Sequence, residues 1–269
     1  MTTPKLDILI STYGEEGLAR IADHKHPRME GVRYIVAAQG LPENYLLPDR
    51  LKESDFKVVE SPGKGLSRNR NFSLSLAEAP LAMIADDDLD FEPRYFNAIF
   101  KAYNDNPAAD AIFFTYESAD YPKNYPSHSY DFSDGIPKGY FVTSFEITFR
   151  TQRIKGNYRF DEKFGIGSRF PSGEEDLFVD SLRRGGLTLR FESAPIARHD
   201  GSTTSDRVMN SPSFIRTRGA VIRRIHPKTW VLRMFPHALR HVKANSSACS
   251  VRGFLSYLRY WLEGGFDKF

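Results

Sequence analysis

Residues 81–88 read Leu81-Ala82-Met83-Ile84-Ala85-Asp86-Asp87-Asp88, five apolar residues followed by three aspartates. A short apolar run that ends at polar turn residues is typical of a strand buried on both faces. Strands of this kind form mostly parallel sheets whose faces are covered by helices. Ligands of such sheets bind beyond the carboxyl ends of the strands, which is where the aspartates lie. The stretch therefore predicts an α/β fold and a candidate ligand site at one edge of its sheet.

The same alternation extends on both sides of this stretch. Short apolar runs closed by turn residues alternate with amphipathic segments, which is the pattern of βαβ units. The expected strands are residues 6–10, 33–38, 57–60, 81–85, 111–116, 144–149 and 187–191, and the expected helices are a segment beginning near 66, 93–103 and 174–184. Residues 117–140 are rich in Tyr, Pro, Ser and Asp and are expected to form a long surface loop. The predicted fold class is an α/β/α sandwich around a mostly parallel sheet.

The composition is that of a globular protein of 269 residues and 30.7 kDa. Hydrophobic residues make up 41% of the chain, which supports a packed core and argues against disorder. The single cysteine, Cys249, excludes an internal disulfide and a Cys-rich zinc module. No apolar run approaches the roughly 20 residues that span a bilayer, and the first residues lack a signal-peptide pattern. We therefore expect a soluble cytoplasmic protein.

Charge is distributed unevenly along the chain. Residues 1–206 contain 25 basic and 32 acidic side chains, whereas residues 207–269 contain 12 Lys or Arg and 2 Asp or Glu, a net charge of +10. Helical periodicity in these last residues covers 214–225, 229–242 and 250–262, where basic side chains lie among apolar and aromatic ones. Such helices bind anionic membrane surfaces or bury their apolar sides on the main domain as a cap, and the pattern allows both. Nucleic-acid binding is less favoured because no recognised module accompanies the charge.

The aspartates at 86–88 have two interpretations, a solvated acidic turn or a cation site. Clustered carboxylates repel one another unless a cation lies among them, and hard oxygen ligands suit Mg²⁺ or Mn²⁺ bound together with a diphosphate. Taken alone, the triplet is more simply a solvated turn. Residues 62–71 reverse that preference, because a Gly-rich turn with Lys64 and Arg68 opens a helix at another strand end and favours an anion. This turn lacks the spacing of a Walker loop.

Three further acids, Glu174, Glu175 and Asp176, stand at the expected start of a helix, after a loop at 164–173. Acids at this place stabilise the helix dipole, so helix capping is one interpretation. The other is a general base that deprotonates an acceptor hydroxyl. His199 follows the last expected strand. A single histidine is usually structural, but beside the acidic triplet it is a candidate third metal ligand.

Taken together, these segments resemble the family 2 inverting glycosyltransferases, whose fold is the GT-A type. The resemblance covers most of residues 5–200, and its segments occur in the order of that family. They are Leu6–Tyr13, Lys64–Asn71, Asp86–Asp88 in the place of the Asp-x-Asp motif, Ser144–Arg150 with Phe160–Gly167, and Glu174–Phe178 on the Glu-Asp motif. One departure follows the second expected strand, where the family often has Asp-Asp-Gly-Ser and this chain has Ala37-Ala38-Gln39-Gly40.

The resemblance implies a donor site, a metal site and a catalytic base. The residues implied for donor binding are Thr12, Tyr13, Gln39, Lys64, Arg68, Asn71, Asp86 and Asp87. Those implied for a divalent metal, Mn²⁺ or Mg²⁺, are Asp88, Asp86 and His199. Glu175 takes the place of the base, with Asp176 and Glu174 as its rivals. The implied organisation is a GT-A domain at 1–206, with a nucleotide-binding half (1–110) and an acceptor half (111–206), followed by the C-terminal helical segment (207–269).

The function that the resemblance implies is metal-dependent, inverting transfer of a sugar from a nucleotide-diphosphate donor, with a UDP-sugar preferred. The acceptor would be a saccharide or a lipid-linked saccharide in the synthesis of cell-surface polysaccharide. The basic C-terminal helical segment would then hold the enzyme peripherally at the cytoplasmic face of the inner membrane. Two alternatives stay open. One is a nucleotidyltransferase of similar fold, and the other is a catalytically silent scaffold that binds nucleotide-sugars.

Overall fold

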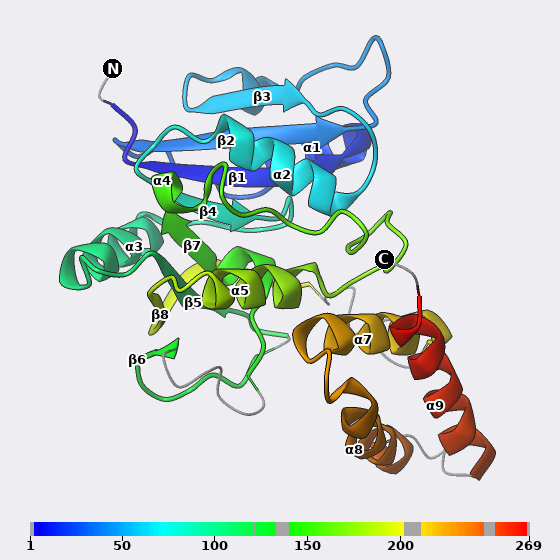
Figure 1. The fold of residues 1–269 in the computed structure, drawn as a ribbon. Coiled ribbons are helices and arrows are strands. Elements are labelled where there is room, and N and C mark those ends of the chain that lie inside the picture. Colours follow the sequence, from blue (N-terminus) through cyan, green and yellow to red (C-terminus); the bar gives the residue numbers. More distant parts are fainter. Residues whose placement is uncertain (1–2, 121, 133–139, 202–210, 245–250, 268–269) are drawn as a thin grey trace.

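The computed structural model describes residues 3–120, 122–132, 140–201, 211–244 and 251–267. Its centre is an eight-stranded sheet with the order β3-β2-β1-β4-β7-β5-β8-β6 (Figure 1). The strands are β1 (Leu6–Tyr13), β2 (Val32–Gln39), β3 (Phe56–Glu60), β4 (Leu81–Ala85), β5 (Ala111–Glu117), β6 (Tyr130–Asp131), β7 (Ile147–Arg150) and β8 (Leu189–Arg198). The helices of the sheet domain are α1 (Gly14–Asp23), α2 (Leu66–Leu76), α3 (Pro93–Asp105), α4 (Thr151–Ile154) and α5 (Glu174–Arg184), with 3₁₀ turns at Asp49–Lys52 and Ser144–Glu146.

Parallel pairing brings the ends of the first four strands to one edge of the sheet. Strand β1 pairs in parallel with β2 on one side and with β4 on the other, in the register Leu6↔Leu81 and Ile10↔Ala85. Strand β7 is inserted antiparallel between β4 and β5, and β8 again runs parallel to β5. The residues that follow β1 and β4 therefore lie next to each other, as expected of ligand-binding residues in an open α/β sheet.

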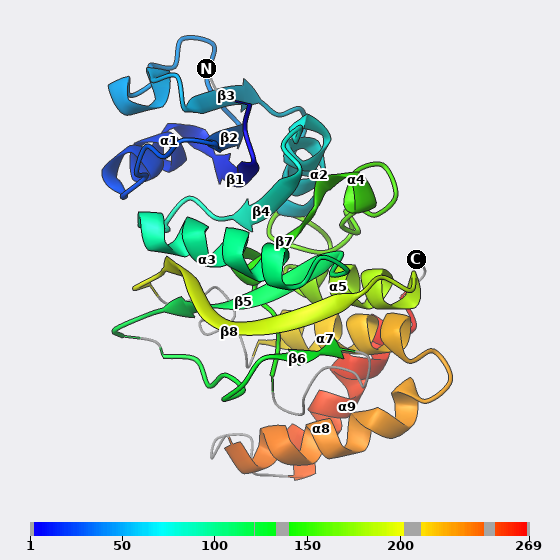
Figure 2. The ribbon, with the colours of Figure 1, turned by 90° about the vertical axis from the view of Figure 1, so that its left-hand side faces the viewer.

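Side chains alternate across the sheet and create two separate cores, as the period of two in a strand requires. Ile8 and Ile10 of β1 pack in one core with side chains of α1 and α3. Leu9, between them, packs in the other core with side chains of α2, α4 and α5. Figure 2 shows these two helix layers on opposite sides of the sheet. The predicted α/β/α sandwich is confirmed.

The structure differs from the sequence prediction in several elements. The expected strand 144–149 is split into a 3₁₀ turn and β7, because Thr143 and Glu146 form a capping box that bends the chain before the strand begins. Helix α1 was not predicted, since it follows β1 directly and buries only Gly17, Leu18 and Ile21. Strand β8 extends well beyond the predicted 187–191. The predicted loop 117–140 contains the short strand β6, and its residues 121 and 133–139 lie outside the described residues.

The C-terminal helical segment forms α7 (Pro212–Ile225), α8 (Trp230–Ala244) and α9 (Val251–Gly265), which share an apolar core of their own. Two glycines let the backbones of α7 and α9 meet. A Cβ atom on Gly219 would lie 2.1 Å from the carbonyl oxygen of Trp261, and one on Gly264 would lie 1.8 Å from that of Arg216. In Figure 1 this bundle lies below the sheet domain, with α7 nearest to it.

Helix α7 also packs on the sheet domain. Its Ala220 and Val221 are buried in a small cluster with Phe164 and Phe170. Gly173, just before α5, has a φ of +87°, and a Cβ atom there would lie 2.5 Å from a methyl carbon of Val221. The cap interpretation of the basic segment therefore holds for α7. Among the described residues, no helix is long and apolar enough to cross a membrane.

Candidate active site

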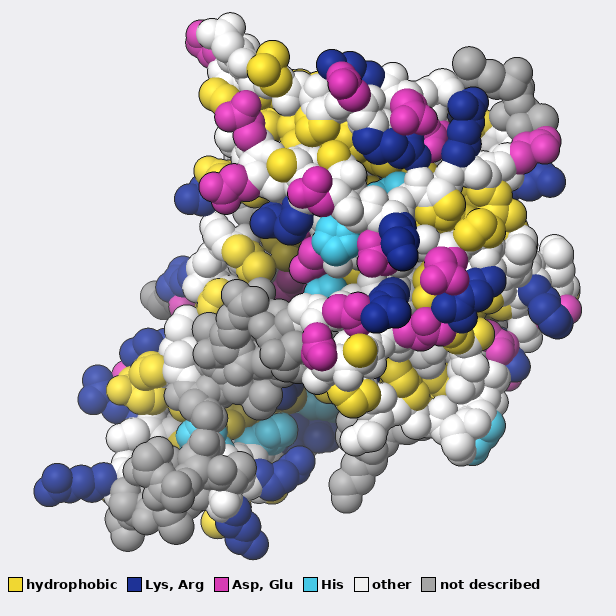
Figure 3. Space-filling view, turned by 180° about the vertical axis from the view of Figure 1, so that it is seen from behind, with side chains coloured by type: hydrophobic (Ala, Val, Ile, Leu, Met, Phe, Trp, Pro, Cys, Tyr) yellow, Lys and Arg dark blue, Asp and Glu magenta, His cyan; other side chains and the backbone are white. Residues whose placement is uncertain are grey.

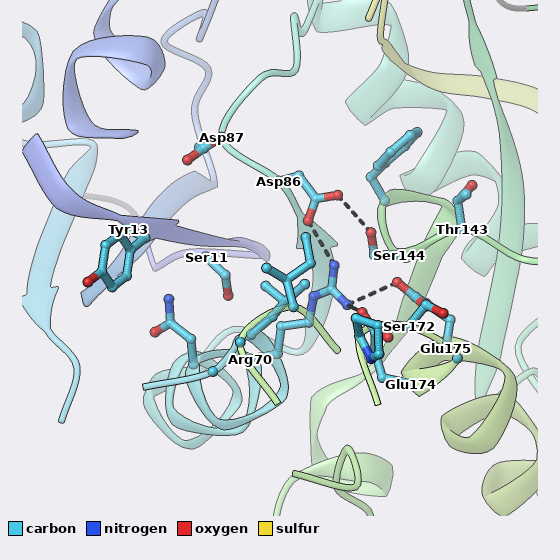
Figure 4. Close-up of a pocket in the computed structure, with 18 of the residues that line it drawn as sticks. Ser11, Tyr13, Arg70, Asp86, Asp87, Thr143, Ser144, Ser172, Glu174 and Glu175 are labelled. Carbon is cyan, nitrogen blue, oxygen red and sulfur yellow. Dashed lines mark hydrogen bonds and ion pairs between the residues drawn. The ribbon is translucent and has the colours of Figure 1, made fainter. Parts of the chain in front are cut away.

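A pocket of about 920 Å³ opens at the sheet edge where β1 and β4 end. Its walls come from the end of β1, the start of α2, the aspartates after β4, the loop 141–145, the start of α5, His199 and α7. Figure 4 shows Arg70 of α2 between Asp86, which follows β4, and the acids Glu174 and Glu175 at the start of α5. The pocket thus brings together most of the candidate donor residues with the candidate metal and base residues, and it also includes side chains of α7, the first helix of the C-terminal helical segment.

Arg70 lies at the centre of the site as a buried cation bridging two groups of acids. Its side chain is 2% exposed, and one guanidinium nitrogen, Nη2, lies 2.9 Å from Asp86 Oδ1. The other, Nη1, lies 3.1 Å from Glu174 Oε1 and 3.0 Å from Glu175 Oε1 (Figure 4). Burial would lower the pKa of Arg70, but the charges of Asp86, Glu175 and Glu174 outweigh it and raise that pKa. Arg70 thereby ties the end of β4 to the start of α5.

Helical geometry explains why Arg70, rather than Arg68, reaches the pocket. Asn69, Arg70 and Ser73 point inward from α2 and are buried. Arg68 points away, and its Nε donates to Glu162 at 2.9 Å. Asn71 accepts from the backbone N–H of Phe160 at 2.8 Å. Hydrogen bonds from the outward side of α2 therefore hold that helix against residues 160–162.

Two predicted donor contacts are corrected by this geometry. Neither Arg68 nor Asn71 lines the pocket, whereas Lys64, Asn69 and Arg70 do. The physical reason is the helical period of 3.6 residues, which advances each side chain by about 100°. Asn69 and Arg70 therefore share the inward side, and Arg68 and Asn71, three residues apart, share the outward side. The sequence analysis did not identify which side of this helix faces inward.

The three aspartates after β4 turn in three directions. Asp86 accepts from Ser144 Oγ at 2.9 Å as well as from Arg70. Asp87 accepts from the hydroxyl of Thr12 and from Arg20, whose Nε lies 3.0 Å away. Asp88, the third aspartate, is turned toward His199.

Asp88 and His199 form the candidate metal pair. Oδ2 of Asp88 lies 3.2 Å from Nε2 of His199, whose side chain is buried. Burial would lower the pKa of His199, but the hydrogen bond with Asp88 and its charge raise it. Burial would in turn raise the pKa of Asp88, and the hydrogen bond with His199 lowers it.

The predicted three-residue metal site is not formed among the described residues. No group of three or more His, Cys, Asp or Glu side chains in that part of the chain is placed to hold a metal, because Arg70 and Ser144 occupy Asp86. A carboxylate and an imidazole side by side on the pocket wall nevertheless fit Mn²⁺ or Mg²⁺ when the other ligands are diphosphate oxygens and water. Asp88 and His199 are the pair that would hold such an ion.

The part of the pocket wall formed by the ends of β1 and β2 and by α2 carries polar atoms that have no hydrogen-bond partner in the described structure. Ser11 Oγ, Gln39 Nε2 and Asn69 Oδ1 are buried without a hydrogen-bond partner among the described residues, although each residue lines the pocket. Tyr13 is exposed and its ring lies over Gly40, where a Cβ atom would come within 2.6 Å of the ring. Buried polar atoms without partners are costly unless a ligand or water satisfies them. This wall therefore suits a polar, planar group such as a nucleobase.

The acids at the start of α5 differ in their surroundings. Glu174 is buried against Arg70, and burial together with the charge of Glu175 raises its pKa despite that cation. Glu175 is partly buried and bound to Arg70. Asp176 makes no contact with Arg70 in the described structure, and its side chain is 37% exposed.

Asp176 faces a cation of the C-terminal helical segment. Its Oδ2 lies 3.8 Å from Nη1 of Arg218 on α7. Its position deep in the pocket raises the pKa of Asp176, an effect that the charge of Arg218 opposes and that of Glu175 increases. A carboxyl group with a raised pKa, open to a pocket, has the properties of a general base.

Several pocket residues were missed by the sequence reasoning. They are Ser11, Arg20, Asn69, Arg70, Ser144 and Arg218. For Asn69 and Arg70 the sequence does contain a signal, since both lie within residues 64–71, on the side of the helix that faces inward. Ser144 and Arg218 reach the pocket only through long-range packing, which no local pattern encodes.

Comparison with known proteins identifies the class of this fold. The family model described as glycosyl transferase family 2 matches residues 43–165. No curated protein matches the chain. The structure of S. aureus TarS matches with a TM-score of 0.61 and 14% identity over 95% of this chain, which spans 55% of the TarS chain.

Two further structures carry ligands. The 1–349 form of S. aureus TarS in complex with UDP matches with a TM-score of 0.62 and 14% identity, covering 96% of this chain and 90% of that one. The mannosyltransferase PcManGT from Pyrobaculum calidifontis, in complex with GDP-Man and Mn²⁺, matches with a TM-score of 0.53 and 11% identity, covering 98% and 86%. At these identities the likeness establishes the fold, which is the GT-A fold predicted from the sequence.

Proposed function

We propose that this chain, a family 2 glycosyltransferase of the GT-A fold, transfers a sugar from a UDP-sugar to a saccharide or lipid-linked saccharide with inversion. The observation that carries the proposal is the arrangement of one pocket. A wall with unpaired polar atoms, a cation-binding pair and an open carboxylate all face the same space. A single in-line displacement needs a bound donor, a group that stabilises the charge on the leaving diphosphate, and a base beside the attacking hydroxyl.

The donor end of the pocket would bind the nucleotide. Tyr13 and the unpaired Gln39 Nε2 are placed for a base, and Lys64 lines the pocket as a cation for the diphosphate. The choice of UDP follows the S. aureus TarS 1–349 structures that contain UDP and UDP-GlcNAc, while the PcManGT complex contains GDP-Man. Gln39 stands where the family often has an acid, so we propose that its amide takes over a contact to the nucleoside.

Asp88 and His199 would hold a divalent metal at the diphosphate. When bound, such an ion neutralises the charge that develops on the leaving nucleoside diphosphate. Asp86 would not be a direct ligand, because Arg70 and Ser144 use both of its oxygens. It would instead fix the chain just before Asp88.

Asp176 is our candidate for the base, in place of the Glu175 favoured by the sequence alone. Arg70 binds Glu174 and Glu175 by direct contacts of 3.1 and 3.0 Å, so both carboxyl groups belong to this bridge and are not turned toward an acceptor hydroxyl. Asp176 makes no contact with Arg70 in the described structure; it faces Arg218 at 3.8 Å, and its pKa is raised. It would take the proton from the acceptor hydroxyl as that oxygen attacks the anomeric carbon from the face opposite the leaving diphosphate.

Donor binding is expected to depend on metal and on Asp88. In a thermal-shift measurement, UDP with Mn²⁺ should stabilise the protein by about 2.7 kcal/mol when UDP is present at about 100 times its Kd. UDP without metal should give a much smaller shift. In Asp88→Ala and His199→Ala the metal-dependent part should disappear, because the pair loses one of its two ligands.

The matched control for these variants is Asp49→Ala, an aspartate on an exposed 3₁₀ turn. It should keep the full shift. An Asp88→Ala protein with an unchanged metal-dependent shift would contradict the assignment of the pair. Binding without any turnover over a panel of acceptors would favour the silent scaffold, and turnover that needs no acid of α5 would favour a nucleotidyltransferase.

Helix α8 carries an apolar face that we propose contacts an anionic membrane surface. Leu232, Phe235 and Leu239 are exposed at 70%, 45% and 53%, and their spacing of three and four residues places them on one side of the helix. Arg233 and Arg240 stand on the same helix. Apolar side chains beside cations are the features of an interfacial helix that binds anionic lipid.

Vesicle binding is expected to require this face. The triple substitution Leu232→Ser, Phe235→Ser and Leu239→Ser should abolish co-flotation with vesicles that contain phosphatidylglycerol. Vesicles of phosphatidylcholine alone should bind the unchanged protein weakly, because the electrostatic attraction is missing. Leu46→Ser removes a leucine that is 85% exposed in the sheet domain and should leave binding intact. Equal flotation of the triple variant and the unchanged protein would exclude the membrane role of α8.

A further inference from the structure

The C-terminal helical segment contributes directly to the pocket. Phe214, Thr217, Arg218 and Val221, four residues of α7, line it. Among them Arg218 carries a charge, and it faces Asp176 across a distance of 3.8 Å between Nη1 and Oδ2. A group that binds next to the base is part of the acceptor, because the base must reach the attacking hydroxyl. Arg218 is therefore on the acceptor side of the site.

Arg218 differs from the other arginines of α7 in how it is paired. Arg216 donates to Glu263 at 2.7 Å, and Arg224 lies 2.9 Å from Asp161. Arg223 donates to the backbone carbonyl of Gly265. The ion pair of Arg218 is longer than a direct hydrogen bond, 39% of its side chain is exposed, and the residue lines the pocket. Its guanidinium donors are thus available to a ligand that displaces the weak contact with Asp176.

Further positive charge continues from Arg218 along α8. Arg240 stands on α8, and its charge, like that of Arg218, acts on His237 and on Tyr257. Burial and these arginines lower the pKa of His237 to about 4, so His237 is neutral and adds no charge. Figure 3 shows histidine and Lys or Arg side chains in a hollow between the sheet domain and the helical bundle.

We propose that Arg218 binds a phosphate group of the acceptor, so that the acceptor class of this enzyme is a phosphate-bearing saccharide. A guanidinium matches phosphate oxygens with two parallel hydrogen bonds, and phosphate has more charge and more acceptor oxygens than a carboxylate. The inference rests on the proposed glycosyl transfer. The phosphate can belong to a polyprenyl diphosphate saccharide or to a phosphodiester polymer, and both present the same chemistry to Arg218.

The test is equilibrium binding to protein already saturated with UDP and Mn²⁺, so that the donor site is filled. The probes are an oligo(glycerol phosphate), a detergent-solubilised farnesyl diphosphate N-acetylglucosamine, and uncharged methyl glucoside. The unchanged protein should bind at least one phosphate probe more tightly than the glucoside. Preference for the oligomer or for the lipid-linked probe identifies the source of the phosphate. In Arg218→Gln, phosphate binding should weaken roughly 10- to 100-fold, the loss of a hydrogen bond between charged groups.

The phosphate affinity of Arg218→Lys should lie between those of the unchanged protein and of Arg218→Gln, because lysine keeps the charge and loses the paired donors. Arg259→Gln is the matched control, since Arg259 is an exposed arginine of α9 whose ion pair is with Glu263. It should bind like the unchanged protein. Equal phosphate affinity in Arg218→Gln and the unchanged protein would overturn the inference, as would glucoside binding as tight as phosphate binding. UDP binding measured on the same samples separates the two claims, since its absence would contradict the proposed function itself.

Discussion

Asparagine in place of Asp176 is expected to lower the rate of sugar transfer about 10²- to 10⁴-fold, the usual contribution of a general base. The amide keeps the shape of the side chain but cannot accept the proton of the acceptor hydroxyl. Binding of UDP and metal should remain, because neither Asp88 nor His199 contacts Asp176 in the described structure. The measurement is steady-state transfer, with UDP binding determined on the same preparation.

Glu175→Gln provides the matched comparison, one residue earlier on the same helix. Its effect should be smaller, since Glu175 is bound to Arg70 and would act by holding α5 in place. If Glu175→Gln abolishes transfer while Asp176→Asn leaves it within a few-fold of the unchanged enzyme, the base is Glu175, as the sequence alone favoured. The pair of variants therefore decides between the two acids.

Removal of the Arg70 charge is expected to have the largest effect on stability. Arg70→Met leaves Asp86, Glu174 and Glu175 close together without their shared cation. Breaking a buried ion pair by removing one partner costs about 3–5 kcal/mol. Urea unfolding should show a loss of this size in the free energy of unfolding. Transfer activity should be lost in the protein that stays folded, because the end of β4 and the start of α5 are no longer joined.

Arg68→Met is the control for Arg70→Met, because it removes an arginine from the same helix. Arg68 pairs with Glu162 at the surface, where an ion pair contributes about 0–1 kcal/mol, so its loss should cost little. In the double variant Arg70→Met with Glu174→Gln, part of the lost stability should return, because one of the uncompensated buried charges is removed. An Arg70→Met protein as stable as the Arg68→Met protein would refute the bridging role.

Local sequence patterns were sufficient for most of the architecture. The apolar run 81–85 and the amphipathic segment 174–184 coincide with β4 and α5 residue for residue. Such elements are encoded by periodicity and by turn residues, which act over a few positions. Helix α1 escaped prediction because few of its side chains are apolar, and the stretch 144–149 because a capping box bends it.

The sequence by itself determined the α/β/α sandwich, since the alternation of buried strands and amphipathic helices is a local pattern, and its resemblance to the family 2 glycosyltransferases implied the GT-A type. Only the tertiary structure decided which side chains of the candidate site act together. Arg70 joins Asp86 to Glu174 over 16 and 104 positions of sequence, and Arg218 reaches Asp176 from a helix beyond the sheet domain. The physical reason is that the direction of a side chain follows from helix rotation and long-range packing, and neither is fixed by the residues next to it in the chain.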